Sequence, residues 1–127
     1  MNLLILIASI LSMLAAIIHM IGGEKTVFDH LLKSDVKLNS KLELRGVWYA
    51  FGIDLAITSI FLFFLSFESS LVENQLFIIF CSLRFILYGL GVLFAVLITD
   101  RKHLFKVPQW LLLLVIGIIT LLGLYTF

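Results

Sequence analysis

The sequence predicts an all-α integral membrane protein: four transmembrane helices in an antiparallel bundle, plus a short cytoplasmic interfacial helix. Of its 127 residues, 62% are hydrophobic and 13% charged, and the mean hydropathy is +1.19. Soluble domains are roughly half apolar and a quarter charged. Four apolar stretches are each about long enough to cross a bilayer, and short polar segments separate them. We therefore expect one transmembrane domain over residues 1–127.

The first apolar stretch, residues 3–21, predicts a retained transmembrane helix. A cleaved signal peptide would carry Lys or Arg near its start, whereas this chain begins Met1-Asn2. Small and polar residues recur along one side at steps of three or four: Ala8, Ser12, Ala15, His19, Gly22 and Gly23. In lipid such a stripe lets helix backbones approach closely. We expect a packing surface, with a ligand groove as the alternative.

The segment after the first span predicts a helix end followed by an interfacial helix. Gly22 and Gly23 are expected to end the first helix, since glycine is common at C-terminal caps. Residues 24–33 place apolar side chains on one side and charged ones on the other. This pattern is typical of a short amphipathic helix lying flat on the membrane surface.

The second helix is expected to start near Lys41 and to span the membrane over residues 46–67. Ser40 and Glu43 have the spacing of a capping box just before this span. Its apolar run contains one acid, Asp54. A charged side chain in the hydrocarbon layer is energetically costly unless it faces protein or water. We therefore expect Asp54 to have a polar or charged partner on a neighbouring helix.

The third span covers residues 75–99, after Asn74 as a plausible N-cap. It carries Arg84 and, on the same side, Tyr88 and the small residues Gly91 and Ala95, which we expect to form a second packing stripe. The fourth span, residues 108–126, begins at Pro108, because proline is tolerated in a first helical turn, and contains no charge.

Loop charges predict the orientation in the cytoplasmic membrane. The two segments 25–45 and 101–106 contain every Lys and Arg except Arg84. Positively charged loops remain in the cytoplasm, so both chain termini are expected outside. Trp48 and Trp110 then lie near the inner membrane interface, as aromatic belts require.

Three residues form the leading candidate for a ligand or proton site. His19 and Asp54 lie in the inner half of oppositely directed helices, and their side chains lean toward each other. Two interpretations remain open for this pair, a packing hydrogen bond and a shared proton, and the packing hydrogen bond is slightly favoured. Arg84 lies roughly 10 Å outward of Asp54, so a direct ion pair requires tilt or extension. Tyr88 and Glu24 complete the candidate set.

Other chemistries lack their sequence signals. The histidines, His19, His30 and His103, form no compact metal motif, and only His19 lies within a span. We therefore expect no metal and no haem or other cofactor. There is no phosphate-binding glycine loop and no basic-aromatic patch for nucleic acid. The single Cys81 has no partner for an intrachain disulfide.

The leading functional hypothesis is a membrane protein that binds or moves a small solute or ion through an intramembrane polar site. Four helices of this size fill their own interior, so transport would require an oligomer. The alternative is an accessory or assembly subunit whose polar residues meet partner transmembrane helices. A membrane-embedded enzyme is the third hypothesis, without assigned catalytic residues. Membrane lipid is the expected environment in every case.

Overall fold

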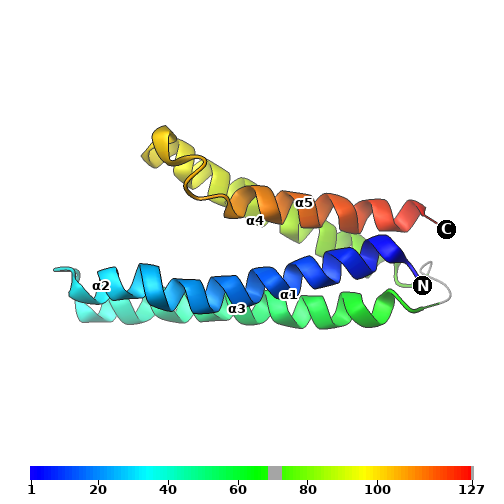
Figure 1. Ribbon diagram of the computed structural model, residues 1–127, viewed down its shortest axis with the longest axis horizontal. Helices are drawn as coiled ribbons and strands as arrows, with labels where there is room; N and C mark the ends of the chain where they lie inside the picture. Colours follow the sequence, from blue (N-terminus) through cyan, green and yellow to red (C-terminus); the bar gives the residue numbers. More distant parts are fainter. Residues whose placement is uncertain (69–72, 127) are drawn as a thin grey trace.

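The computed structural model describes residues 1–68 and 73–126, and every secondary-structure element within these ranges is a helix or a helical turn (Figure 1). The elements in chain order are α1 (Leu3–Gly23), the π-helical η1 (Glu24–Phe28), α2 (Asp29–Lys33), α3 (Leu38–Leu65), α4 (Gln75–Thr99), the 3₁₀ turn η2 (Arg101–His103), α5 (Gln109–Leu122) and the 3₁₀ turn η3 (Gly123–Tyr125). The predicted loop after the second span lies partly outside the described residues.

Three helices are long and apolar enough to cross a membrane, and a fourth apolar helix is shorter. The long ones are Leu3–Lys33, Leu38–Leu65 and Gln75–Thr99, and the shorter one is Gln109–Tyr125. The predicted helical membrane fold is confirmed at this level. The last helix is shorter than predicted because its α-helical part ends at Leu122 and continues only as one 3₁₀ turn.

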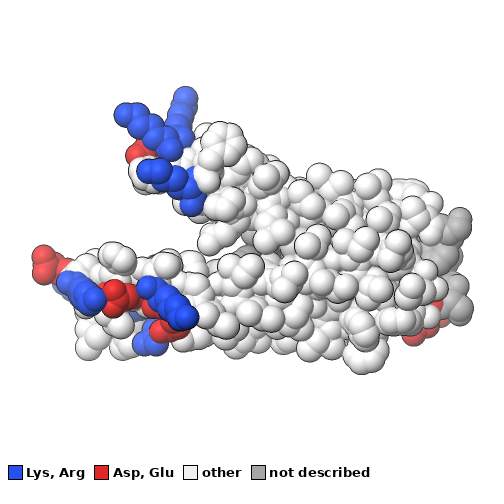
Figure 2. Space-filling model, viewed as in Figure 1, with Lys and Arg blue, Asp and Glu red and all other residues white. Residues whose placement is uncertain are grey.

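The helices pair as two hairpins. α1 packs along α3 and α4 packs along α5, while α5 also contacts α1 and so joins the pairs. The hairpins lie together at the end that holds both chain termini and diverge toward the end that holds α2 and the α4–α5 connection (Figure 1). The basic segments occupy the tips of the two diverging arms (Figure 2). Both positively charged loops therefore lie at one end of the molecule and both termini at the other.

The prediction that Gly22 and Gly23 end the first helix is wrong. Gly23 has right-handed helical angles, with φ −58° and ψ −45°, and no glycine in the described residues has the positive φ of a C-terminal glycine cap. The chain continues through η1 into α2 as one helix to Lys33. Gly23 is buried because the Trp48 indole of α3 lies against it. The expected flat interfacial helix is instead the end of this long helix.

The predicted caps also differ from those observed. α3 begins at Leu38, without a side-chain cap, so Ser40 and Glu43 lie inside the helix. Asn74 precedes α4 but makes no cap bond. Among the described α-helices, the capping side chain is Asn2, at the start of α1.

Asn2 joins three helix ends at the terminal side of the molecule. Its Oδ1 accepts from the Ile5 amide at 3.1 Å and its Nδ2 donates to the Gly123 carbonyl at 2.6 Å. Its backbone amide donates to the Ser66 carbonyl at 2.6 Å. These bonds satisfy groups that helix ends leave free, and they close the bundle where the hairpins meet.

Small residues set the distance between α1 and α3. Ser9 Oγ donates to the Ser59 carbonyl at 3.0 Å, and Ser59 Oγ donates to the Ser9 carbonyl at 2.8 Å. Ser12 Oγ donates to the Leu55 carbonyl at 3.0 Å. Each such bond between helices is worth about 0.6 kcal/mol in a membrane. Together they fix the register of the first hairpin.

Candidate functional site

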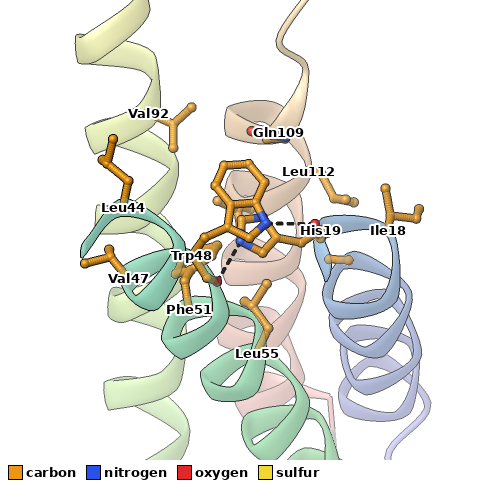
Figure 3. Close-up of a pocket in the computed structure, with 12 residues that line it drawn as sticks. Ile18, His19, Leu44, Val47, Trp48, Phe51, Leu55, Val92, Gln109 and Leu112 are labelled. Atoms are coloured by element: carbon orange, nitrogen blue, oxygen red, sulfur yellow. Dashed lines mark hydrogen bonds between the residues drawn. The ribbon is translucent and has the colours of Figure 1, made fainter. Parts of the chain in front are cut away.

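A cleft of about 330 Å³, the interhairpin cleft, lies between the diverging arms (Figures 2 and 3). Helices α1, α3, α4 and α5 all contribute to it. Three lining side chains carry polar atoms, namely His19, Trp48 and Gln109, and the rest are apolar: Ala15, Ile18, Leu44, Val47, Phe51, Leu55, Val92, Leu112 and Leu113. Along α3 the lining extends from Leu44 to Leu55, roughly 16 Å at the helical rise. The cleft thus runs from the basic end well into the apolar part of the bundle.

His19 is held rigidly in the wall of the interhairpin cleft by Trp48. The two rings stack with centroids 3.9 Å apart and planes 11° from parallel. Their side chains and backbones exchange two hydrogen bonds, Trp48 Nε1 to the His19 carbonyl at 3.0 Å and His19 Nε2 to the Trp48 carbonyl at 3.1 Å (Figure 3). Because a carbonyl only accepts, Nε2 carries the proton and Nδ1 is the acceptor of the neutral ring.

The expected His19–Asp54 contact is not formed. The register that pairs Ser12 with Leu55 and His19 with Trp48 places Asp54 level with Met13, roughly 9 Å along α1 from His19. His19 therefore meets the backbone of α3 at Trp48, about 1.7 turns from Asp54. The sequence could not establish this register.

Asp54 pairs directly with Arg84 instead. Arg84 Nη1 donates to Asp54 Oδ1 at 2.8 Å, and the side chains are 18% and 33% exposed for Arg84 and Asp54, respectively. Arg84 Nη2 also donates to the hydroxyl of Thr58, which itself donates to the Asp54 carbonyl at 2.7 Å. The inclination between the hairpins supplies the tilt that this pair required (Figure 1). The pair ties α3 of one hairpin to α4 of the other.

A chain of ring contacts connects the interhairpin cleft to this ion pair. The edge of Phe51 meets His19 and Tyr88, each with centroids 5.0 Å apart. The Arg84 guanidinium carbon then lies 5.9 Å from the centroid of the Tyr88 ring. Phe51 lines the cleft but Tyr88, Asp54 and Arg84 do not. The charged pair is therefore separated from the cleft by aromatic side chains.

Glu24 belongs to a separate cluster at the basic end of the first hairpin. Arg45 forms a bidentate pair with it, through Nε to Oε1 at 3.0 Å and Nη2 to Oε2 at 2.8 Å, and the Tyr49 hydroxyl also donates to Oε1. The Arg45 guanidinium lies over the Phe28 ring at 5.6 Å. Glu24 lies in the π-helical turn, so this cluster fixes the continuation of α1 against α3. Glu24 was a candidate site residue, but no sequence pattern predicted its pairing with Arg45 and Tyr49.

The connection between α4 and α5 carries excess positive charge. Residues 100–108 contain Arg101, Lys102 and Lys106 against one acid, Asp100. The Asp100 carboxylate accepts the Lys102 amide at 3.0 Å and the His103 ring at 2.8 Å. These hydrogen bonds, from the Lys102 backbone first and the His103 side chain second, lower the pKa of Asp100. The carboxylate is thus engaged by its own turn, while the three cations extend from the tip of the arm.

The predicted packing stripes are buried only in part. Ala8, Ser12, Ala15 and Gly23 are buried, whereas Gly22 is only half-buried, with open space where a Cβ would stand. On α4, Gly91 and Ala95 are exposed, and the close contact is made by Gly89, where an added Cβ would lie 2.8 Å from the Trp110 carbonyl. The predicted α4 stripe therefore faces away from the rest of this chain.

Among the residues that the structure describes, no group of three His, Cys, Asp or Glu side chains is arranged to hold a metal ion. Comparison with protein families, with curated proteins and with solved structures finds no match for this chain. Its function therefore has to be argued from its own geometry.

Proposed function

We propose that this protein binds a narrow, largely apolar molecule in the interhairpin cleft, within the cytoplasmic half of the membrane. The observation that carries the proposal is the cleft itself, about 330 Å³ in volume and lined by apolar side chains with His19, Trp48 and Gln109 among them. Ligand pockets typically have volumes of roughly 300–1,000 Å³ and combine apolar walls with a few placed polar groups. The stacked and hydrogen-bonded His19 supplies one such fixed polar group.

The lining of the interhairpin cleft favours an apolar occupant. Nine of the twelve lining side chains are apolar. A water held there is disfavoured, because a stable buried water needs two to four polar partners. An apolar tail is the occupant that matches these walls.

Binding is better supported than ion conduction. Asp54 and Arg84 pair at 2.8 Å, with Asp54 Oδ2 and Arg84 Nε buried and without a hydrogen-bond partner among the described residues. Both side chains lie behind Phe51 and Tyr88, away from the interhairpin cleft. A paired charge that ties two helices is a structural element rather than a free site for a passing ion. In this proposal Asp54, Arg84 and Tyr88 support the closed end of the cleft, and His19 contacts the ligand.

The proposed setting is the cytoplasmic membrane with both termini outside. The clustering of the basic segments at the tips of the diverging arms supports this orientation, since positive loops remain inside (Figure 2). The open end of the interhairpin cleft would then face the inner leaflet.

An accessory role is the second candidate, supported by the exposed small residues of α4. Gly91 has open space where a Cβ would stand, and Ala95 is exposed one turn further along. Such a surface lets a partner helix, or a second copy of this chain, approach closely in lipid. Replacing both residues by Ile would reduce crosslinked oligomers if this surface is a contact.

Ligand binding is tested by native mass spectrometry of the purified protein with a single-chain probe, palmitoyl lysophosphatidylcholine. We expect one probe molecule retained per chain. Val92→Phe adds bulk inside the interhairpin cleft and should reduce retention several-fold. Leu90→Phe is the matched control, because Leu90 lies on the same helix, is 47% exposed and does not line the cleft. Equal retention by both variants would reject the proposed site.

A further inference from the structure

We infer that the interhairpin cleft selects an anionic phospholipid, whose acyl chain enters between the hairpins while its phosphate contacts the cations of the α4–α5 connection. This inference rests on the proposed occupation of the cleft and specifies the ligand class. It follows from how charge is distributed on the two arms that border the open end (Figure 2).

The arm formed by α1, α2 and α3 balances most of its positive charge. Residues 24–45 contain five cations (Lys25, Lys33, Lys37, Lys41 and Arg45) and four acids (Glu24, Asp29, Asp35 and Glu43), a net charge of +1. Arg45, next to the lining residue Leu44, is bound on two sides by Glu24, with its Nη2 2.8 Å from Oε2. Lys33 pairs with Asp29 at 2.8 Å, and Lys41 donates to two backbone carbonyls at 2.8 and 2.7 Å. Residues 100–108, with three cations and one acid, carry the larger net charge of +2.

The arm formed by α4 and α5 is different. Among the described residues, no ion pair holds the side chains of Arg101, Lys102 or Lys106, and the single nearby acid, Asp100, is engaged by its own turn. In Figure 2 most of the charged side chains at the tip of the upper arm are basic. Gln109, which lines the interhairpin cleft, follows Lys106 by three residues, so this positive charge borders the opening.

An apolar cleft with a cationic border on one side complements an anionic amphiphile. The source is the inner leaflet itself, because the cleft opens between transmembrane hairpins at the end where the headgroups lie. Basic residues between transmembrane helices on this side are a recognised way to bind anionic headgroups. Each Lys or Arg near the surface raises affinity for an anionic lipid about fivefold.

The experiment compares two vesicle preparations of identical lipid composition, equal parts phosphatidylglycerol and phosphatidylcholine. In one the acyl chains of the phosphatidylglycerol are brominated, and in the other those of the phosphatidylcholine are. Bromine quenches tryptophan on contact, so Trp48, which lines the interhairpin cleft, reports which lipid enters it. The Trp110→Phe background leaves Trp48 as the only tryptophan. The reverse variant, Trp48→Phe, keeps Trp110, which does not line the cleft and reports the surrounding lipid.

We expect Trp48 to prefer brominated phosphatidylglycerol at least about fivefold, with Trp110 showing a smaller preference. Replacing Arg101, Lys102 and Lys106 by Gln should abolish the preference. The matched control replaces Lys25, Lys33 and Lys37 by Gln, which removes the same charge from the other arm and should leave the preference intact. The single variants Lys102→Gln and Lys106→Gln, which perturb the fold least, should each lower it.

The outcomes separate this inference from the proposed function. Strong but equal quenching of Trp48 by both lipids would overturn the choice of an anionic headgroup and leave cleft occupation standing. A preference that survives the triple and single substitutions would also overturn it. Absence of Trp48 quenching by either lipid would reject occupation of the interhairpin cleft itself.

Discussion

Removal of both partners of the Asp54–Arg84 pair should destabilise the protein by less than the sum of the two single removals. Two polar groups and three rings contact the Arg84 guanidinium. The polar groups are the Asp54 carboxylate at 2.8 Å and the Thr58 hydroxyl, and the rings are Phe80, Phe85 and Tyr88 at 5.6–5.9 Å. With Asp54→Asn the guanidinium loses its counter-charge at a depth where a lone Arg costs about 3 kcal/mol. With Arg84→Met the Asp54 carboxylate is left without a counter-charge.

The expected magnitude follows from the burial of the two side chains. Breaking a fully buried pair costs about 3–5 kcal/mol. Since Arg84 is 18% and Asp54 33% exposed, the lower part of that range applies, and we expect each single substitution to cost about 3 kcal/mol. The double variant leaves no lone charge, so its loss should fall short of the sum by about 2 kcal/mol.

The assay is reversible unfolding in mixed micelles of dodecyl maltoside and sodium dodecyl sulfate, followed by circular dichroism. A control cycle of Asp54→Asn with Arg45→Met should be additive, because Arg45 pairs with Glu24 and not with Asp54. Arg84→Lys should recover only part of the stability, since one ammonium lacks the planar fork that reaches carboxylate and hydroxyl together. Additivity of the Asp54 and Arg84 substitutions within about 0.5 kcal/mol would refute the coupling.

Three further predictions concern packing, topology and pH. Gly23→Ala should cost about 1–3 kcal/mol in the same unfolding assay, because the new methyl group would overlap the Trp48 indole. Gly22→Ala should be neutral or stabilising, because there is open space where its Cβ would stand, and equal effects of the two substitutions would contradict the close contact at Gly23. In a Cys-free background, a cysteine at Thr126 should react with an impermeant maleimide on intact cells, and one at Asp35 only after permeabilisation, while the reverse pattern would invert the topology. The pKa of Asp100 is lower in the folded protein than in the unfolded chain, so the ionised carboxylate stabilises its turn above the unfolded pKa and this contribution is lost as pH falls through the folded pKa. The NMR shift of the Lys102 amide should therefore titrate with a midpoint below that of an unstructured Asp peptide. A midpoint at the peptide value would show that the turn does not bind the carboxylate.

The interhairpin cleft could not be predicted from the sequence because it is a place where helices fail to meet. Its walls come from four helices, and residues such as Leu44, Val92 and Leu112 have the same apolar character as side chains that face lipid. Trp48 was predicted as an interfacial anchor. Only the packing of α1 against α3 turns it toward Gly23 and His19.

The sequence by itself determined the number of apolar helices, their order, and the placement of positive charge at alternate loops, because hydropathy and loop charge are local properties of the chain. It also determined that Asp54 and Arg84, as charges inside apolar helices, would each need a partner. The tertiary structure decided that they are partners of each other, that His19 meets Trp48, and that the helix passes straight through Gly22 and Gly23. Helix register, tilt and continuation depend on how side chains from segments far apart in the sequence pack together. A local sequence pattern does not show which of those segments meet.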